Sequence, residues 1–263
     1  MISLSRMKPI GLWVGFRLQL AELRTQADIF YAFVTAPCFA LIFMSIAEYT
    51  GQRHMAVSAL IAPTLMTMWD AALTFSGDII GDDRENGRLE PLVASPAAFS
   101  PVLCGRLLAC MTLSLPAFTL SVLVAGVIFD HWIVIHHPLL FVATLLVTGL
   151  ATAGTSTALA AVFVASSGAR IIQNTLSYPI FLLGGVVVPT SAFPDWLESV
   201  SGLVYLSWSA DLLRAAQEPA PIDAAAARLV AIALLGGAAL GIGRVVIARL
   251  LRQARHQGTL TRV

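Results

Sequence analysis

Long apolar stretches take up most of this 263-residue chain, and they limit what it can fold into. A helix needs roughly 20 mostly apolar residues to cross a hydrocarbon core about 30 Å thick. Six stretches meet that requirement, and they lie at residues 29–47, 55–77, 106–129, 139–165, 175–192 and 224–247. Their hydropathy is continuous rather than alternating, which favours helices over a β-barrel. The sequence therefore predicts an all-α membrane protein with six transmembrane helices.

The composition supports lipid as the main solvent. Charged residues make up 12% of the chain, against about 25% in an ordinary soluble domain, and the mean hydropathy is +0.82. The net charge is only +1, and no basic patch interleaves with aromatic residues. The composition thus indicates a membrane partner and no nucleic-acid partner.

The basic residues predict the orientation, because Lys and Arg are retained on the cytoplasmic side. With both termini inside, thirteen of the sixteen basic residues are cytoplasmic: Arg6, Lys8, Arg17, Arg24, Arg84, Arg88, Arg106, Arg170, Arg244, Arg249, Arg252, Arg255 and Arg262. Three are then external: Arg53, Arg214 and Arg228. We therefore expect a multi-pass protein of the cell membrane with its N-terminus and C-terminus in the cytoplasm.

One segment, GDDRENGRLEPLVASP at residues 81–96, carries six charges between two apolar runs. In the predicted topology it is cytoplasmic and belongs to a loop at residues 78–100. Its apolar and charged side chains suit a docking partner, whereas a solvated loop without a partner is the plainer alternative. The residues that we assign to docking are Arg84, Glu85, Gly87, Arg88, Leu89, Glu90, Leu92 and Pro96.

Two further segments are expected at the membrane surface. Residues 10–28 have apolar side chains at steps of three and four, which predicts an interfacial amphipathic helix, although an ordinary helix packed on a partner fits the same pattern. Residues 182–223 are external, rich in proline and apolar, which predicts short re-entrant helices. In that segment we expect Trp196, Tyr205 and Trp208 at the level of the lipid headgroups.

Small residues recur in two of the predicted spans. Gly149, Ala153, Thr157, Ala161 and Ala165 follow one another at four-residue steps, and Gly237 and Gly241 have a GxxxG spacing. Such residues let helices approach closely in lipid, so both sets are predicted packing faces.

Trp69 and Asp70 lie deep within the second predicted span. A carboxylate in hydrocarbon costs about 2.5–3.5 kcal/mol on insertion scales, so Asp70 is expected to face protein or water. It either lines a cargo or proton path or accepts a hydrogen bond between helices. The second interpretation is slightly favoured.

The chain shows no catalytic or metal-binding pattern. Its cysteines, Cys38, Cys104 and Cys110, fall in or beside apolar spans and are expected to be buried small side chains. Three histidines, His131, His136 and His137, match no ligand spacing. Lys8 is the only lysine, and no Gly-rich phosphate loop is present, so this chain cannot hydrolyse ATP by that route.

Several of these segments together resemble the permease subunits of ABC type-2 exporters. The charged segment reads Arg84-Glu85-Asn86-Gly87-Arg88-Leu89-Glu90, with Arg88 where the family usually has Thr. After the fifth predicted span come Gly185, Pro189 and Phe193-Pro194-Asp195-Trp196, and later Asp211 to Arg214 in an Asp-x-x-Arg motif. The usual Asn-Pro before the last short helix is replaced here by Leu203 to Leu206. The resemblance covers nearly the whole chain.

The resemblance implies how such a protein works. Two permeases, either two copies or two related chains, pair with cytoplasmic ATP-binding subunits that use ATP and Mg²⁺, so no cofactor is expected on this chain itself. The segment 81–96 is then a coupling helix, and an external gate is expected at Gly185, Pro189, Phe193, Pro194 and Trp196. The cargo is expected to be a hydrophobic drug, a lipid or a lipid-linked glycan.

An ion-coupled secondary carrier that uses Asp70 as its proton site is the alternative function. Such carriers usually show paired repeats and broken helices at the midplane, and neither pattern is visible in the sequence.

Overall fold

The computed structural model of the chain describes residues 4–23, 28–51, 54–85, 99–112, 114–129, 135–165 and 169–257. The α-helices of these residues are α1 (Leu4–Leu23), α2 (Asp28–Thr50), α3 (His54–Glu85), α5 (Phe99–Thr112), α6 (Ser114–Phe129), α7 (Pro138–Ala165), α8 (Ala169–Leu183), α9 (Asp195–Ser201), α10 (Tyr205–Ala215) and α11 (Ala225–Gln257). A 3₁₀ turn, η1, covers Thr190–Ala192. Within the described residues there is no strand, which confirms the predicted all-α class.

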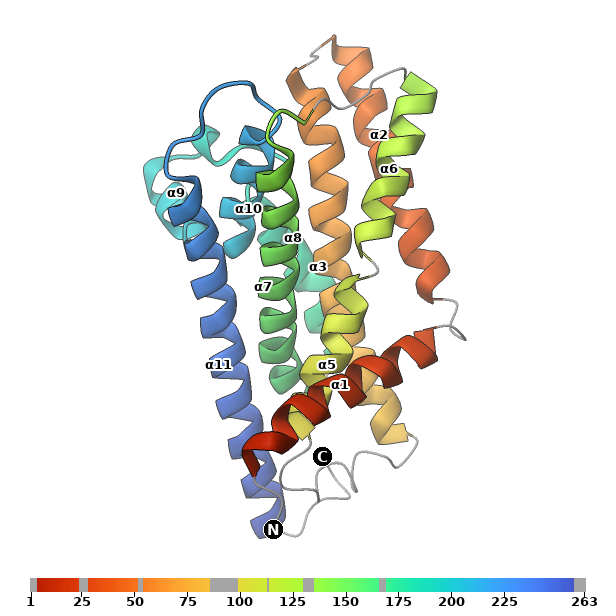
Figure 1. Cartoon of the computed structure of the whole chain (residues 1–263), viewed down its shortest axis with the longest axis vertical. Coiled ribbons are helices and arrows are strands. Elements are labelled where there is room, and N and C mark those ends of the chain that lie inside the picture. Colours follow the sequence, from red (N-terminus) through yellow and green to blue (C-terminus); the bar gives the residue numbers. More distant parts are fainter. Residues whose placement is uncertain are drawn as a thin grey trace.

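The long helices lie side by side along the longest axis of the molecule, and α1 crosses them obliquely near one end (Figure 1). The short helices α9 and α10 lie toward the opposite end, which we call the distal end. The start of α1 and the end of α11 lie close together at the α1 end (Figure 1). Two segments of the described chain, Pro138–Phe163 of α7 and Ala225–Leu250 of α11, are long and apolar enough to cross a membrane. The count of six spans stays a prediction.

Glycine allows α1 and α5 to cross with their backbones in contact. A Cβ atom on Gly15 would lie 2.1 Å from the carbonyl oxygen of Val102, and one on Gly105 would lie 2.1 Å from that of Leu12. Such contacts exclude any side chain at either position. The helix α1 therefore buries a face that contains Gly15, while Trp13 on another face is 59% exposed. It starts earlier than the predicted helix at residues 10–28 and is described as far as Leu23.

A buried polar contact ties the same two helices together. Arg106 of α5 donates from Nε to Oε1 of Gln19 in α1 over 2.8 Å, and both side chains are buried. Because hydrogen bonds satisfy buried polar groups that would otherwise be costly, this pair fixes how α1 sits on the bundle.

The contact between α7 and α11 corrects the predicted glycine face. A Cβ atom on Gly236 would lie 2.3 Å from Cα of Ala151, and one on Gly243 would lie 2.6 Å from the backbone nitrogen of Ala158. Gly237 and Gly241, the predicted pair, meet nothing within 4 Å. The contact thus uses glycines two helical turns apart, and the GxxxG pair points elsewhere.

The predicted boundaries of four spans are also corrected. The third predicted span, 106–129, is divided between α5 and α6, and Pro116 stands in the first turn of α6, where a helix tolerates a proline. The fifth, 175–192, is helical only to Leu183. The second and sixth continue as helix to Glu85 and Gln257, beyond their predicted ends at 77 and 247.

The main apolar core lies where α3, α7, α10 and α11 meet. Leu65, Leu206, Leu213 and Ile232, which come from three of these helices, are almost fully inaccessible to solvent. Because α10 inserts its apolar face here, the predicted external segment 182–223 is anchored to the core by this helix. Cys38 of α2, predicted to be buried, is exposed.

Candidate functional site

The end of α8 is set by a glycine in the left-handed region. Gly185 has φ +58°, and its N–H donates to the carbonyl of Leu182 over 3.0 Å. The next N–H, that of Val186, donates to the carbonyl of Phe181 over 3.2 Å. These two bonds form a Schellman motif, which ends the helix and satisfies the carbonyls of Phe181 and Leu182.

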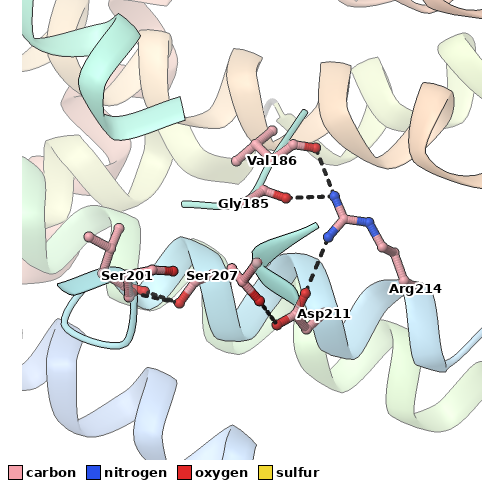
Figure 2. Close-up of polar contacts among 8 residues, drawn as sticks. Gly185, Val186, Ser201, Ser207, Asp211 and Arg214 are labelled. Atoms are coloured by element: carbon pink, nitrogen blue, oxygen red, sulfur yellow. Dashed lines mark hydrogen bonds and ion pairs between the residues drawn. The ribbon is translucent and has the colours of Figure 1, made fainter. Parts of the chain in front are cut away.

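Arg214 of α10 binds two carbonyls that follow the end of α8. Its Nη2 donates to the carbonyl oxygens of Gly185 at 2.6 Å and Val186 at 2.9 Å, while Nη1 forms an ion pair of 3.2 Å with Asp211. The other oxygen of Asp211 accepts a bond of 3.1 Å from Thr190 in η1. Figure 2 shows the guanidinium between the two carbonyls and Asp211. We call Gly185, Val186, Thr190, Asp211 and Arg214 the distal latch.

The latch joins three segments through one cation. Burial lowers the pKa of Arg214, and the neighbouring carboxylate of Asp211 opposes this shift. The guanidinium remains charged, because arginine is not deprotonated in proteins. A positive charge at the end of a helix also complements the negative end of the helix dipole. The latch is therefore held by charge-assisted bonds on both sides of the guanidinium.

A polar cavity of about 200 Å³ lies beside the latch. Its lining includes Thr190 and Asp211 from the latch, together with Glu198 of α9, Trp208 of α10 and Arg228 of α11. The side chain of Asp211 is 38% exposed. A cavity lined by charged side chains suits water or lipid headgroups rather than hydrocarbon.

Polar pairs anchor α10 on α7. Thr148 donates to Oγ of Ser209 over 2.8 Å, and the hydroxyls of Thr152 and Tyr205 lie 2.9 Å apart. Burial raises the pKa of Tyr205 to about 12, so the phenol stays neutral. Tyr205 is 3% exposed, which corrects its predicted place among the lipid headgroups.

Two of the three histidines that match no ligand spacing contact the same region of the structure. His136 Nδ1 lies 2.7 Å from the carbonyl oxygen of Gln217, and His137 Nε2 lies 3.2 Å from that of Ala220. Both contacts join the start of α7 to the chain that follows α10. His131 lies outside the described residues.

Of the predicted gate residues, only Gly185 belongs to the latch. Pro189 and Phe193 flank η1, and Pro194 precedes α9, the short helix that the spacing of its apolar residues predicts. Trp196 is 69% exposed, and its place at the lipid headgroups stays a prediction. From the sequence, Asp211 and Arg214 are identified only as the ends of an Asp-x-x-Arg motif, with no predicted contact to Gly185. One feature of the sequence could have indicated a buried contact here. Asp211 and Arg214 are opposite charges one helical turn apart in an otherwise apolar segment, so they need polar partners within the protein.

Asp70 lies midway along α3 and pairs with α8. Oγ of Ser177 donates to Oδ1 of Asp70 over 3.0 Å. Trp69 beside it is 4% exposed, belongs to the main core, and its Nε1 has no hydrogen-bond partner among the described residues. The contact with Ser177 is the interhelical bond that the sequence slightly favours, and a cargo-path role for either residue stays a prediction.

The predicted docking residues fall mostly outside the described part of the chain. Arg84 and Glu85 are the last two residues of α3. The remaining six, Gly87, Arg88, Leu89, Glu90, Leu92 and Pro96, lie in residues 86–98, which the structure does not describe. Among the described residues, no cluster of His, Cys, Asp or Glu could hold a metal ion.

Comparison with protein families decides the class of this molecule. The family described as ABC-2 type transporter matches residues 12–217. The chain belongs to the ABC-2 type transporter family. The match runs from α1 to the end of α10 and includes both the charged segment and the distal latch. A search of curated proteins found no match. The chain is thus a membrane transport subunit of the ABC type.

Proposed function

We propose that this chain is the permease subunit of an ATP-driven exporter. It moves a hydrophobic or amphipathic cargo, such as a drug, a lipid or a lipid-linked glycan, out of the cytoplasm. The observation that carries the proposal is the family match over residues 12–217, because it covers the segments on which the coupling and the gate depend.

Energy comes from a separate ATP-binding subunit. The chain's single lysine, Lys8, is not part of a Gly-rich phosphate loop, and in P-loop ATPases that lysine reaches the phosphates. ATP and Mg²⁺ are therefore bound by the partner. Two permeases pair in the membrane, as two copies of this chain or as this chain and a related one.

Coupling takes place at the segment 81–96, within the cytoplasmic loop 78–100. The helix α3 supports this proposal, because it continues to Glu85, eight residues or about 12 Å past the predicted end of the second span. Arg84 and Glu85 thereby stand beyond the apolar part of the helix. A partner that moves this end moves α3 as a rigid rod, and with it the contact between Asp70 and α8.

The distal latch and the residues around it form the external gate. Supporting this, one guanidinium holds the end of α8, and its partner Asp211 holds η1. A change in the angle of α8 must either carry η1 and α10 along or break these bonds. The predicted gate residues Pro189, Phe193 and Pro194 connect the segments so joined.

The proposed topology has six spans with both termini in the cytoplasm of a cell-membrane protein. The helices α5 and α6 together make the third span. The helix α8 has 15 residues and is about 22 Å long, shorter than a hydrocarbon core of about 30 Å. The chain after Leu183, with η1 and α9, completes that crossing as a re-entrant external segment.

Co-purification tests the proposal. The tagged chain is extracted in mild detergent, the proteins that accompany it are identified by mass spectrometry, and ATP hydrolysis is measured in the eluate. We expect a phosphate-loop ATPase and ATP turnover. A preparation with neither would overturn the exporter and direct attention to proton-driven transport through Asp70.

A further inference from the structure

An apolar groove of about 380 Å³ lies where α1, α5, α7 and α11 meet, in the half of the molecule that α1 crosses. Its volume is within the range of about 300–1,000 Å³ that is usual for ligand pockets. The residues that matter for the argument are Leu12, Pro101, Leu150, Gly237, Leu240 and Arg244. Leu150 is 61% exposed, so the groove opens to the outside of the bundle.

The floor of the groove is open because of a glycine. Gly236 packs against Ala151, but Gly237, the next residue, would place a Cβ atom with nothing within 4 Å. Gly237, Leu240 and Arg244 are three and four residues apart, so they follow one face of α11. The groove therefore extends along the helix for at least the two turns from Gly237 to Arg244, about 10 Å.

A cation lies at one end of this apolar strip. Arg244 is exposed and lines the groove, and no ion pair joins it to a carboxylate whose side chain the structure describes. Further along α11 come Arg249, Arg252 and Arg255. An apolar groove that ends beside a positive charge can hold a molecule that has an apolar chain and an anionic headgroup.

We propose that this groove binds an acyl chain of an anionic phospholipid along α11 from Gly237, with the lipid phosphate beside Arg244. In the proposed topology the groove lies in the cytoplasmic leaflet, where anionic lipids attract basic residues. The site is separate from the coupling segment and from the distal latch. It rests on the proposed membrane topology but not on the identity of the cargo.

Native mass spectrometry tests the site on the full chain, purified with the subunits that accompany it. Dioleoyl phosphatidylglycerol and dioleoyl phosphatidylcholine are titrated separately, and apparent affinities are compared. Gly237→Leu fills the groove floor, and we expect affinity for phosphatidylglycerol to fall about tenfold or more. Gly241→Leu is the matched control, because Gly241 is also exposed and free of contacts but does not line the groove.

Arg244→Gln tests the contribution of the lipid phosphate separately from that of the acyl chain. We expect it to lower the affinity for phosphatidylglycerol about fivefold while leaving that for phosphatidylcholine unchanged. Soluble glycerol phosphate should not compete, since it lacks the acyl chain. Thermal unfolding of each variant checks that the fold is kept.

Three results would overturn the proposal. One is equal lipid affinity in the Gly237→Leu and Gly241→Leu variants. Another is an Arg244→Gln variant that keeps its preference for phosphatidylglycerol. A third is a change of oligomeric state in Gly237→Leu without a change in lipid binding, which would assign the face to a second copy of the chain. ATP is not needed, so none of these results bears on the exporter itself.

Discussion

The guanidinium of Arg214 donates a hydrogen bond of 2.6 Å to the carbonyl oxygen of Gly185, 29 residues earlier in the chain. The same nitrogen reaches the carbonyl of Val186 at 2.9 Å. Both carbonyls are available because the left-handed Gly185 ends α8 at this point. A side chain of α10 thus caps α8, and the two helices are expected to move together.

Replacing Arg214 should loosen the distal latch. Arg214→Ala leaves two carbonyls and the carboxylate of Asp211 without this partner, so the free energy of unfolding should fall by about 1–3 kcal/mol. Arg214→Lys should recover only part of the loss, because an ammonium group lacks the fork that reaches both sides. The measurement is unfolding in detergent micelles.

Arg228→Ala is the control for that experiment. Arg228 lines the neighbouring polar cavity but forms no ion pair with Glu198 or Asp211. Its removal should change the free energy of unfolding by no more than about 0.5 kcal/mol. An equal loss of unfolding free energy in the Arg228→Ala and Arg214→Ala variants would show that the bonds of the latch do not stabilise the fold specifically.

Gly185→Ala tests how tightly the latch is packed. Alanine at φ +58° is strained, and its Cβ atom would lie 2.6 Å from Cγ2 of Thr190. Gly51 has a similar φ of +66° but nothing within 4 Å, so Gly51→Ala carries the backbone strain alone, about 1–2 kcal/mol. Gly185→Ala should lower the free energy of unfolding further. The same loss in both variants would contradict the close contact with η1.

Two neighbouring glycines of α11 should respond in opposite directions. Gly236→Ala places a methyl group 2.3 Å from Cα of Ala151, and overpacking of this kind typically costs about 1–3 kcal/mol. Gly237→Ala meets no atom and should stabilise the helix by up to about 1 kcal/mol. Thermal unfolding of both variants is the test. If Gly237→Ala destabilises the protein more than Gly236→Ala, the register of α11 on α7 is wrong.

Asp70→Asn distinguishes a structural carboxylate from a proton site. The amide oxygen of asparagine still accepts the hydrogen bond from Ser177, so fold and transport should stay close to those of the unchanged protein. Asp70→Leu removes the acceptor and should lower the free energy of unfolding by about 1–3 kcal/mol. Loss of transport in a stably folded Asp70→Asn variant would instead support a proton-coupled carrier.

The general course of the chain follows from its hydropathy, while the helix ends depend on single residues. The apolar run at 139–165 coincides with α7, because nothing interrupts it. The run at 175–192 looks like one span, but Gly185 ends the helix before it is complete. Hydropathy averages over many residues and does not register one glycine or one proline.

The contacts between helices, and those within the candidate site, are harder to predict. Gly237 and Gly241 have the familiar spacing, yet Gly236 and Gly243 make the contact with α7, because the rotation of α11 is set by its neighbours and not by its own pattern. The latch depends on backbone carbonyls of Gly185 and Val186, which no side-chain pattern reveals. Tyr205 looks like an interfacial aromatic residue, but Thr152 gives it a buried partner.

Coupling is the central claim, and charge reversal tests it most directly. The measurement is the amount of ATPase that co-purifies with the tagged chain, and its rate of ATP hydrolysis, for the unchanged protein and for two variants. One carries Glu85→Lys and Glu90→Lys together. The other carries Glu218→Lys, a reversal at an exposed residue of the distal segment. We predict that ATPase association and turnover fall in the first variant and not in the second. Unchanged association and turnover in the double variant, with its fold intact, would contradict the assignment of residues 81–96 to coupling.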